Sequence, residues 1–362
     1  VHDGFDAHAV SAGTGIIDID LLAPDSRLTL WSGKLITQAD DRDILLTADD
    51  FDFLSGAGRV VGTGELVIQS QSPVWNRYLG TAAEDNTGAD VARDHFENSM
   101  DLTTRDLAAL ADGFSLITLG RRAPGNTMTI GDAFAADVVK FTGEERVVDA
   151  SFRDHTILLS DHISVQGDVQ APADILDLRT RTMTVASRNL HVPMGLPDSG
   201  VTADTLLLSV DEQLHVGGWL RSPNWFAIDV HSTTGVDQMQ LYPDGPNSLV
   251  TDIGSVIECT GEGGRIDIAA SGSVRLAGLI QINGQGSVLD IDAASTFMML
   301  EGGLIVSRDA NSLIDIAAEI VSINPGTAIS AGATFDNTGG TPVPIQTAPG
   351  ADIVIVAEHE ML

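Results

Sequence analysis

Apolar and polar residues alternate in short runs through the C-terminal third of the chain, and the runs recur at a nearly constant interval. Three such runs occupy residues 264–270, 288–294 and 313–318. They align on Ile266, Leu289 and Ile314, which are 23 and 25 residues apart. In the first run Ile266 and Ile268 flank Asp267, so the two apolar side chains share one strand face and the aspartate points the other way. This internal repeat predicts short strands stacked one above another.

The same alternation appears earlier in the chain with looser spacing. It occupies residues 16–20, 28–30, 34–37, 44–47, 64–69, 157–159, 163–165, 175–178, 183–185 and 205–210. Corners rich in Gly, Ser, Asn and Pro separate the runs, as expected of tight turns between strands. One turn of two or three short strands cannot bury its inner face, but stacked turns can. We therefore predict an all-β fold, a right-handed parallel β-helix (β-solenoid) with loop insertions.

Two segments interrupt this pattern, and a third ends it. The first interruption, at about residues 73–114, includes the helical spacing Leu107, Leu110 and Phe114, so we expect one short helix near residues 103–112. Thr103 or Thr104 can cap its start, and Gly113 can end it. The full predicted organisation is a β-solenoid over residues 1–331, the helix-containing insertion at about 73–114, an aromatic loop region at about 193–246, and residues 332–362 as a loop or linker with a terminal strand or edge segment.

Composition supports a narrow aliphatic core. Hydrophobic residues make up 43% of the chain, aromatic residues only 5%, and 37 residues are glycine. The formal net charge is −32, which repels nucleic acid and anionic lipid, so neither nucleic-acid binding nor membrane insertion is expected. A salt-rich or calcium-rich exterior and simple colloidal solubility both account for such a charge. The chain starts at Val1 without a signal-peptide pattern, which is typical of a processed product or a piece of a longer protein.

Acidic corners between strands provide the candidate metal ligands. Asp49, Asp50 and Asp52 could hold a hard cation through carboxylate oxygens, and calcium is the cation that such ligands favour. Their spacing does not fit the calcium loop of an EF-hand, and otherwise no cofactor is expected. His155 and His162, each preceded by an aspartate, could face one another on neighbouring strands, but ordinary surface histidines explain them better.

The aromatic residues Trp219, Trp225 and Tyr242 are the candidate ligand contacts. Exposed aromatic rings stack on sugar faces and anchor protein interfaces, and the competing explanation is a local hydrophobic cluster under a long loop. No catalytic residues are identified, because the chain lacks a nucleophile elbow, a phosphate-binding loop and a metalloprotease motif. The single cysteine, Cys259, is expected at an inward strand position.

One segment resembles a known family. Residues 102–121 include Asp112, Gly113 and Phe114 and then the strand-like residues 117–121, Ile-Thr-Leu-Gly-Arg, followed by a second strand-like run at 126–130. The segment is similar to one that recurs in giant bacterial β-strand-repeat surface proteins of the filamentous-haemagglutinin-like adhesin type. That resemblance implies a surface or secreted rod of parallel β-coils that serves adhesion or cell contact. It supplies no catalytic residues, and this chain is far shorter than the usual members.

We therefore expect a non-enzymatic structural or adhesive protein at the cell surface or outside the cell. It would be a rod-like segment of a giant surface protein or a subunit of a self-assembling filament. Expected partners are further copies of the chain, joined end to end or laterally, and glycans or other cell surfaces. The alternative is a carbohydrate-active β-helix, either a polysaccharide lyase or a tailspike-like hydrolase, which would use paired carboxylates such as Asp290 and Asp292.

Overall fold

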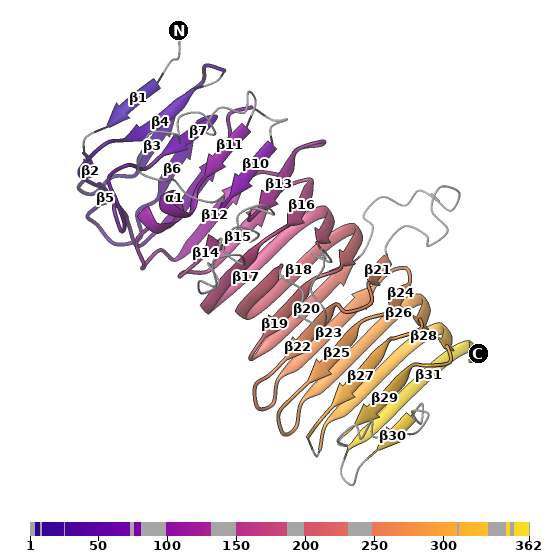
Figure 1. Cartoon of the computed structure of the whole chain (residues 1–362). Coiled ribbons are helices and arrows are strands. Elements are labelled where there is room, and N and C mark those ends of the chain that lie inside the picture. The colour runs from indigo at the N-terminus through magenta and orange to yellow at the C-terminus, as the bar shows by residue number, and fades with distance from the viewer. Residues whose placement is uncertain are drawn as a thin grey trace, which may run out of the picture. The chain divides into compact units, whose positions relative to one another are not determined.

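The computed structural model describes residues 4–7, 9–24, 26–72, 76–80, 99–131, 150–186, 199–230, 248–309, 311–331, 345–347 and 351–361. Within these residues the protein is all-β with one short helix, and its strands pair in parallel (Figure 1). The chain divides into two compact units, Val1–Thr180 and Arg181–Leu362. Each unit is described by itself below.

The first unit contains four sets of paired strands. They are β1 (Gly4–Ala7), β4 (Arg27–Leu30) and β7 (Asp50–Asp52); β2 (Val10–Ala12), β5 (Leu35–Thr37) and β8 (Val60–Val61); β3 (Ile17–Asp20), β6 (Ile44–Thr47), β9 (Glu65–Gln69), β12 (Leu116–Gly120) and β15 (Thr156–Leu159); and β11 (Ser99–Leu102), β10 (Asn76–Leu79), β13 (Thr127–Ile130) and β16 (His162–Val165). The short strand β14 (Ala150–Ser151) pairs with β17 (Asp168–Val185), which also pairs with β15.

The order of the strands departs from the chain order at one place in the first unit. Strand β10 pairs with both β11 and β13, and β11 in turn lies against β7. A strand later in the sequence therefore lies between two earlier ones. The predicted insertion at about residues 73–114 thus contributes two strands to the sheet as well as the helix, and residues 73–75 and 81–98 lie outside the described part.

The predicted helix is confirmed as α1 (Thr104–Ala109), with Thr103 as its N-cap. The helix ends at Ala109, earlier than the predicted end near Gly113. The backbone N–H of Ala111 donates to the carbonyl of Val60, and Leu110 forms a parallel bridge with Val60. These contacts with Val60 end the helix before Gly113.

The second unit contains three ladders of parallel strands. One consists of β19 (Trp219–Ser222), β22 (Val256–Cys259), β25 (Leu279–Ile282), β27 (Leu304–Ser307), β29 (Ala328–Ala331) and β30 (Ile345–Thr347). The second, called the central ladder below, consists of β20 (Trp225–Val230), β23 (Arg265–Ala270), β26 (Val288–Met299), β28 (Leu313–Ile323) and β31 (Asp352–Met361). The third joins β21 (Ser248–Thr251) and β24 (Val274–Leu276) to the C-terminal halves of β26 and β28. The long strand β18 (Gly200–Val216) pairs with β19, β20 and β21 in turn.

The predicted register of the C-terminal repeat is confirmed in the central ladder. Ile266 pairs with Leu289, and Leu289 pairs with Ile314, so the aligned residues stack in one column. All three side chains are fully buried, as are Ile291 and Ile316 in the next column. Columns of aliphatic side chains, each stacked on its equivalent one repeat away, therefore form the core of this unit and keep the strands in register.

The region predicted as an aromatic loop, about residues 193–246, differs from that expectation. Strands β18, β19 and β20 run through residues 200–230, and residues 187–198 and 231–247 lie outside the described part. The strand pattern was hidden because these strands carry Trp219, Trp225 and Phe226 where the later repeats carry aliphatic or charged residues. Within the described residues, no helix is long and apolar enough to cross a membrane.

Candidate functional site

The most chemically distinctive surface of the second unit is the outward face of the central ladder. Strand register places Trp225 beside Arg265, and it places Asp267, Asp290 and Asp315 side by side on three successive strands. These five residues are called the Trp225 face below, and the three aspartates are called the Asp row. They point outward because they alternate with the buried aliphatic columns.

Polar contacts hold the side chains of the Trp225 face in place. The indole N–H of Trp225 donates to Oδ2 of Asp267 over 2.9 Å. Nε of Arg265 lies 2.5 Å from Oδ1 of Asp267, and its Nη2 lies 3.4 Å from Oδ2 of Asp290. Trp225 is nonetheless 45% exposed, so its ring is oriented by a hydrogen bond while much of its surface meets solvent. The hydrogen bond therefore limits the orientations of an indole ring that remains accessible to solvent.

Like charges are crowded along the Asp row. Partial burial raises the pKa of Asp290, and the neighbouring carboxylates of Asp267 and Asp315 raise it further, while Arg265 opposes the shift. One guanidinium thus offsets only part of the repulsion among three carboxylates. The row can accept hydrogen bonds from hydroxyl groups or ammonium groups, and a cationic group would relieve the remaining repulsion.

The second predicted aromatic contact, Trp219, is buried and was wrongly assigned. Only 2% of the residue is exposed, and its indole lies against the backbone of Gly200 on β18, where a side chain would collide with the ring. The guanidinium of Arg221 covers the ring at 5.0 Å from its centroid and forms an ion pair with Glu258. Trp219 therefore packs as part of the fold. Tyr242, the third predicted contact, lies outside the described residues.

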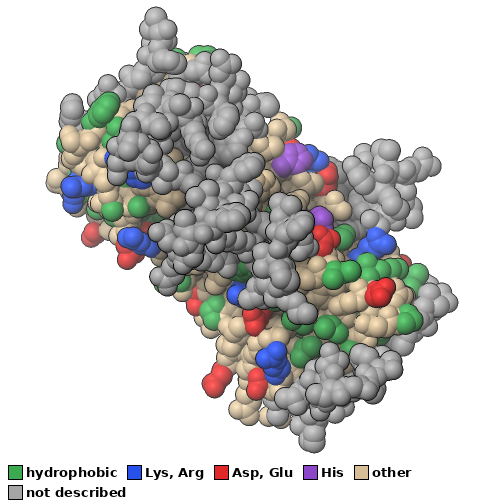
Figure 2. Space-filling model, viewed as in Figure 1, with side chains coloured by type: hydrophobic (Ala, Val, Ile, Leu, Met, Phe, Trp, Pro, Cys, Tyr) green, Lys and Arg blue, Asp and Glu red, His purple; other side chains and the backbone are tan. Residues whose placement is uncertain are grey.

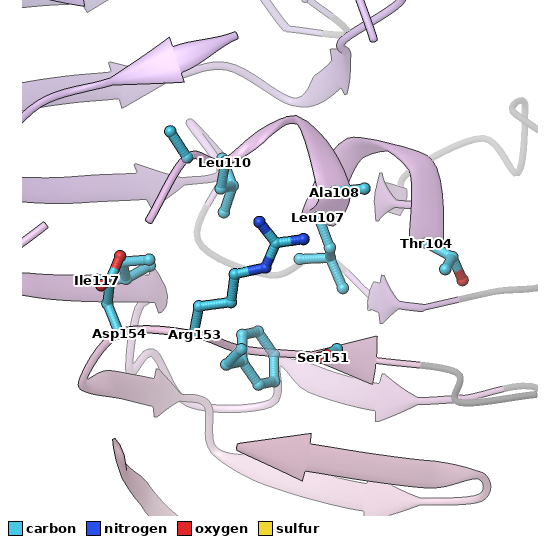
Figure 3. A pocket seen from close by; sticks show the side chains of 10 residues that line it. Thr104, Leu107, Ala108, Leu110, Ile117, Ser151, Arg153 and Asp154 are labelled. Carbon is cyan, nitrogen blue, oxygen red and sulfur yellow. The ribbon is translucent and has the colours of Figure 1, made fainter. Parts of the chain in front are cut away.

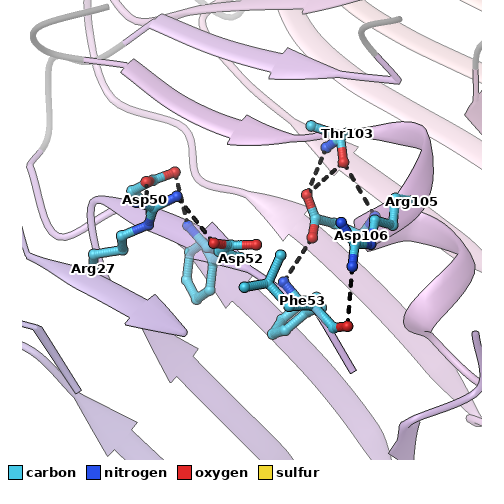
Figure 4. Close-up of polar contacts among 9 residues, drawn as sticks. Arg27, Asp50, Asp52, Phe53, Thr103, Arg105 and Asp106 are labelled. Carbon is cyan, nitrogen blue, oxygen red and sulfur yellow. Dashed lines mark hydrogen bonds and ion pairs between the residues drawn. The ribbon is translucent and has the colours of Figure 1, made fainter. Parts of the chain in front are cut away.

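The predicted cation site at Asp49, Asp50 and Asp52 is not formed. Asp49 is fully buried and accepts hydrogen bonds from the backbone N–H and the hydroxyl of Ser72, at 2.8 and 3.3 Å. Asp50 and Asp52 both form ion pairs of 3.1 Å with Arg27, as Figure 4 shows. The residues that the structure describes contain no group of three or more His, Cys, Asp or Glu side chains placed to hold a metal ion. Asp50 and Asp52 share one face of β7 and converge on the guanidinium of Arg27, whereas Asp49 is turned to Ser72, so the three carboxylates do not converge on one point.

A buried carboxyl that was not singled out from the sequence lies beside that cluster. Asp106 of α1 accepts hydrogen bonds from the backbone N–H of Phe53 over 2.7 Å and from the backbone N–H and hydroxyl of Thr103 (Figure 4). Burial raises the pKa of Asp106 to about 7, although these hydrogen bonds act in the opposite direction. The contacts form a capping box at the start of the helix and tie the helix to the residue that follows β7. The role of Asp106 is therefore structural.

The hollow shown in Figure 3 lies in the first unit, between α1 and the segment from Ser151 to Asp154. Leu107, Leu110 and Phe152 line it, and Arg153 extends across it. Its volume of about 100 Å³ is well below the 300–1,000 Å³ that is typical of small-molecule sites. The carboxylate of Asp154, at its edge, accepts hydrogen bonds from the backbone N–H groups of Gly113 and Phe114, which secures the Asp-Gly-Phe segment.

The remaining candidate residues have ordinary structural roles. Cys259 is fully buried on an inward strand position, as predicted, and burial raises the pKa of its thiol, which disfavours the nucleophilic thiolate. His155 directly precedes β15, whereas His162 lies on β16 in a different set of strands. The two histidines therefore do not face one another on neighbouring strands of one ladder.

The sequence pattern identified Trp225 and the outward aspartates separately. It did not predict that they lie side by side, and it did not identify Arg265 as part of the site. The available signal was the match between Trp225–Val230 and Arg265–Ala270, two strands with the same alternation. In the view of Figure 2, acidic and basic side chains lie scattered singly over the described surface, without one large patch of either sign. No family model, curated protein or solved structure matches this chain.

Proposed function

We propose that this chain is a right-handed parallel β-solenoid that acts outside the cell as a non-enzymatic structural or adhesive protein. In this proposal it is a rod-like segment of a giant bacterial surface protein, or a subunit of a self-assembling filament. The filamentous-haemagglutinin-like resemblance of residues 102–121 favours the surface-protein form. The chain would contact further copies of itself and the glycans of cell surfaces.

The observation that carries this proposal is the repeated parallel register of the second unit. Strands one repeat apart pair residue for residue, with aliphatic columns inside and polar residues outside. Such an arrangement presents long outer faces on a stiff support, which suits surface contact. The site found on one of these faces is a row of side chains along the ladder, without the deep enclosure that excludes water from most catalytic centres.

An adhesion assay combined with a product assay tests the proposal. Beads coated with the chain should be retained under flow on glycan-coated surfaces, and beads coated with an unrelated protein of similar acidity should be washed away. Incubation of the chain with neutral and anionic polysaccharides should release no oligosaccharide. Loss of retention to the level of the acidic control would contradict the adhesive function.

A carbohydrate-active enzyme is the second candidate, and one observation favours it. Asp290 is a carboxyl group with a raised pKa, and it has Asp292 two residues away on the same strand face. Glycoside hydrolysis uses such a pair, with one carboxyl protonated and one ionised. Release of oligosaccharides that stops in Asp290→Asn would establish this candidate and overturn the non-enzymatic proposal.

A further inference from the structure

We propose that the Trp225 face binds a glycan that carries free amino groups, that is, a polymer of amino sugars. The inference rests on the proposed adhesive function and names the ligand class of that function. It places the sugar ring on the indole of Trp225 and the ammonium and hydroxyl groups on the Asp row. The ligand would run across the strands, from β20 towards β28.

Trp225 provides an aromatic platform with a fixed orientation. Its indole N–H is held by Asp267, and the next outward residue on β20 is Ala227, whose small side chain leaves the ring room to lie along the surface. Aromatic faces attract the C–H faces of sugar rings, and they also attract cations. An exposed tryptophan that is already oriented is therefore suited to a sugar that carries an ammonium group.

The negative charge of this face favours a positively charged ligand. The outward positions of β20, β23, β26 and β28 carry Asp229, Asp267, Asp290, Asp292 and Asp315, against the single cation Arg265. A uronic-acid polymer would be repelled, whereas an amino-sugar polymer would be attracted. The pKa of Asp290 is raised first by burial and then by the carboxylates of Asp267 and Asp315, and Arg265 opposes only part of this, which agrees with an excess of negative charge on the face.

The aromatic platform favours a glycan over a basic peptide. The Asp row lies beside Trp225 on the successive strands β23, β26 and β28, which are about 4.8 Å apart. One amino-sugar ring carries a C–H face for the indole together with hydroxyl and ammonium groups for the carboxylates, whereas a lysine side chain carries only its ammonium group on a flexible stem. The carboxylates also form a line and not a cage, since no described group of acidic side chains is placed to hold a metal ion.

Calorimetric titration of the full chain with four probes tests the inference. The probes are a glucosamine hexamer with free amino groups, its N-acetylated form, a galacturonic acid hexamer and a lysine hexapeptide. We expect the glucosamine hexamer to bind at least about tenfold more tightly than the other three, and its affinity should fall with added salt. Equal binding of the N-acetylated hexamer would contradict the role of the charges, and tighter binding of the peptide would overturn the assignment to a glycan.

Variants locate the site. Trp225→Ala should weaken binding of the glucosamine hexamer at least about tenfold, Trp225→Phe should weaken it less, and Asp290→Asn should weaken it while leaving the fold intact. The matched control is Trp31→Ala, because Trp31 is a tryptophan of the first unit that is 53% exposed. Unchanged binding in both Trp225→Ala and Asp290→Asn would refute the site. If coated beads still adhere but the glucosamine hexamer does not bind, this inference alone fails; if the hexamer is cleaved, the non-enzymatic function fails.

Discussion

At the scale of single residues, Asp106 combines a structural role with a shifted protonation equilibrium. Its pKa in the folded protein is about 7, against an ordinary value of 3.8, so the folded chain binds this proton more tightly than the unfolded chain does. A carboxyl whose pKa is raised by folding stabilises the fold fully at pH values below its pKa in the unfolded chain. That stabilisation is lost as the pH rises through its pKa in the folded protein. The contribution of Asp106 should therefore decline between about pH 4 and pH 7.

We predict that Asp106→Asn removes this decline. The difference in the free energy of unfolding between wild type and variant should change by roughly 2–4 kcal/mol between about pH 4 and pH 7, with the wild type losing stability relative to the variant as the pH rises. Urea denaturation at a series of pH values measures it. Asp18→Asn is the control, because Asp18 is exposed on β3. A constant difference across the pH range would show that the pKa of Asp106 is ordinary.

Residue alternation predicted which side chains are inside but not which ones meet across the strands. It correctly placed Ile266, Leu289 and Ile314 inward and Asp267 outward. It could not place Arg265 beside Trp225, because the two residues are 40 positions apart, an interval that fits neither the 23-residue nor the 25-residue spacing of the repeat. The burial of Trp219 was also hidden, since it depends on the bare backbone of Gly200 on a neighbouring strand.

At the scale of elements, the corner between β25 and β26 shows why glycine recurs in the repeat. Gly284 has a φ of +119°, and a Cβ atom there would lie 2.1 Å from the carbonyl oxygen of Gly261, in the equivalent corner one repeat earlier. Gly286, two residues later, has a φ of +76° and open space where its Cβ would be. Both positions favour glycine by conformation, but only Gly284 is also constrained by contact between stacked corners.

These two glycines form a matched pair of variants. Gly286→Ala should cost about 1 kcal/mol of stability, from the left-handed backbone alone. Gly284→Ala should cost at least about 3 kcal/mol, because the backbone of one corner must move away from the other. Thermal or urea unfolding of the two variants measures the difference. Equal losses would show that the corners do not pack as closely as the structure has them.

The short helix was predicted from the sequence but the strand order was not, because the helix depends on local contacts and the strand order on contacts between residues distant in the sequence. The capping residue and the leucine spacing are local signals, so the helix near residues 103–112 was found. Its end at Ala109 depends on Val60, which is distant in sequence and pairs with Leu110. The position of β11 between β7 and β10 has no local signal at all, because it is decided by which strand edge each segment reaches.

At the scale of the whole molecule, the net charge opposes association between copies of the chain, whereas an apolar edge strand favours it. A formal charge of −32 makes copies of the chain repel at low ionic strength, and salt screens that repulsion within about 8 Å at physiological concentration. Within the described residues β31 pairs only with β28, and its outward Val354 and Val356 are 42% and 49% exposed. An apolar strand with an open edge is a surface on which another strand can be added.

If copies of the chain associate through this strand, raising the salt concentration from ~0.05 M to ~0.5 M should shift the chain from monomers to oligomers, because the Debye length falls from roughly 14 Å to roughly 4 Å and the repulsion between copies is screened at closer range. The double variant Val354→Lys, Val356→Lys should stay monomeric, since charged residues on an edge strand oppose pairing. Ile253→Lys makes a similar change at a side chain that is 69% exposed in the same unit, and this variant should associate as the wild type does. Analytical ultracentrifugation measures all three. Association that survives in the double variant would assign the contact to another surface, and wild-type chain that stays monomeric at high salt would contradict self-assembly.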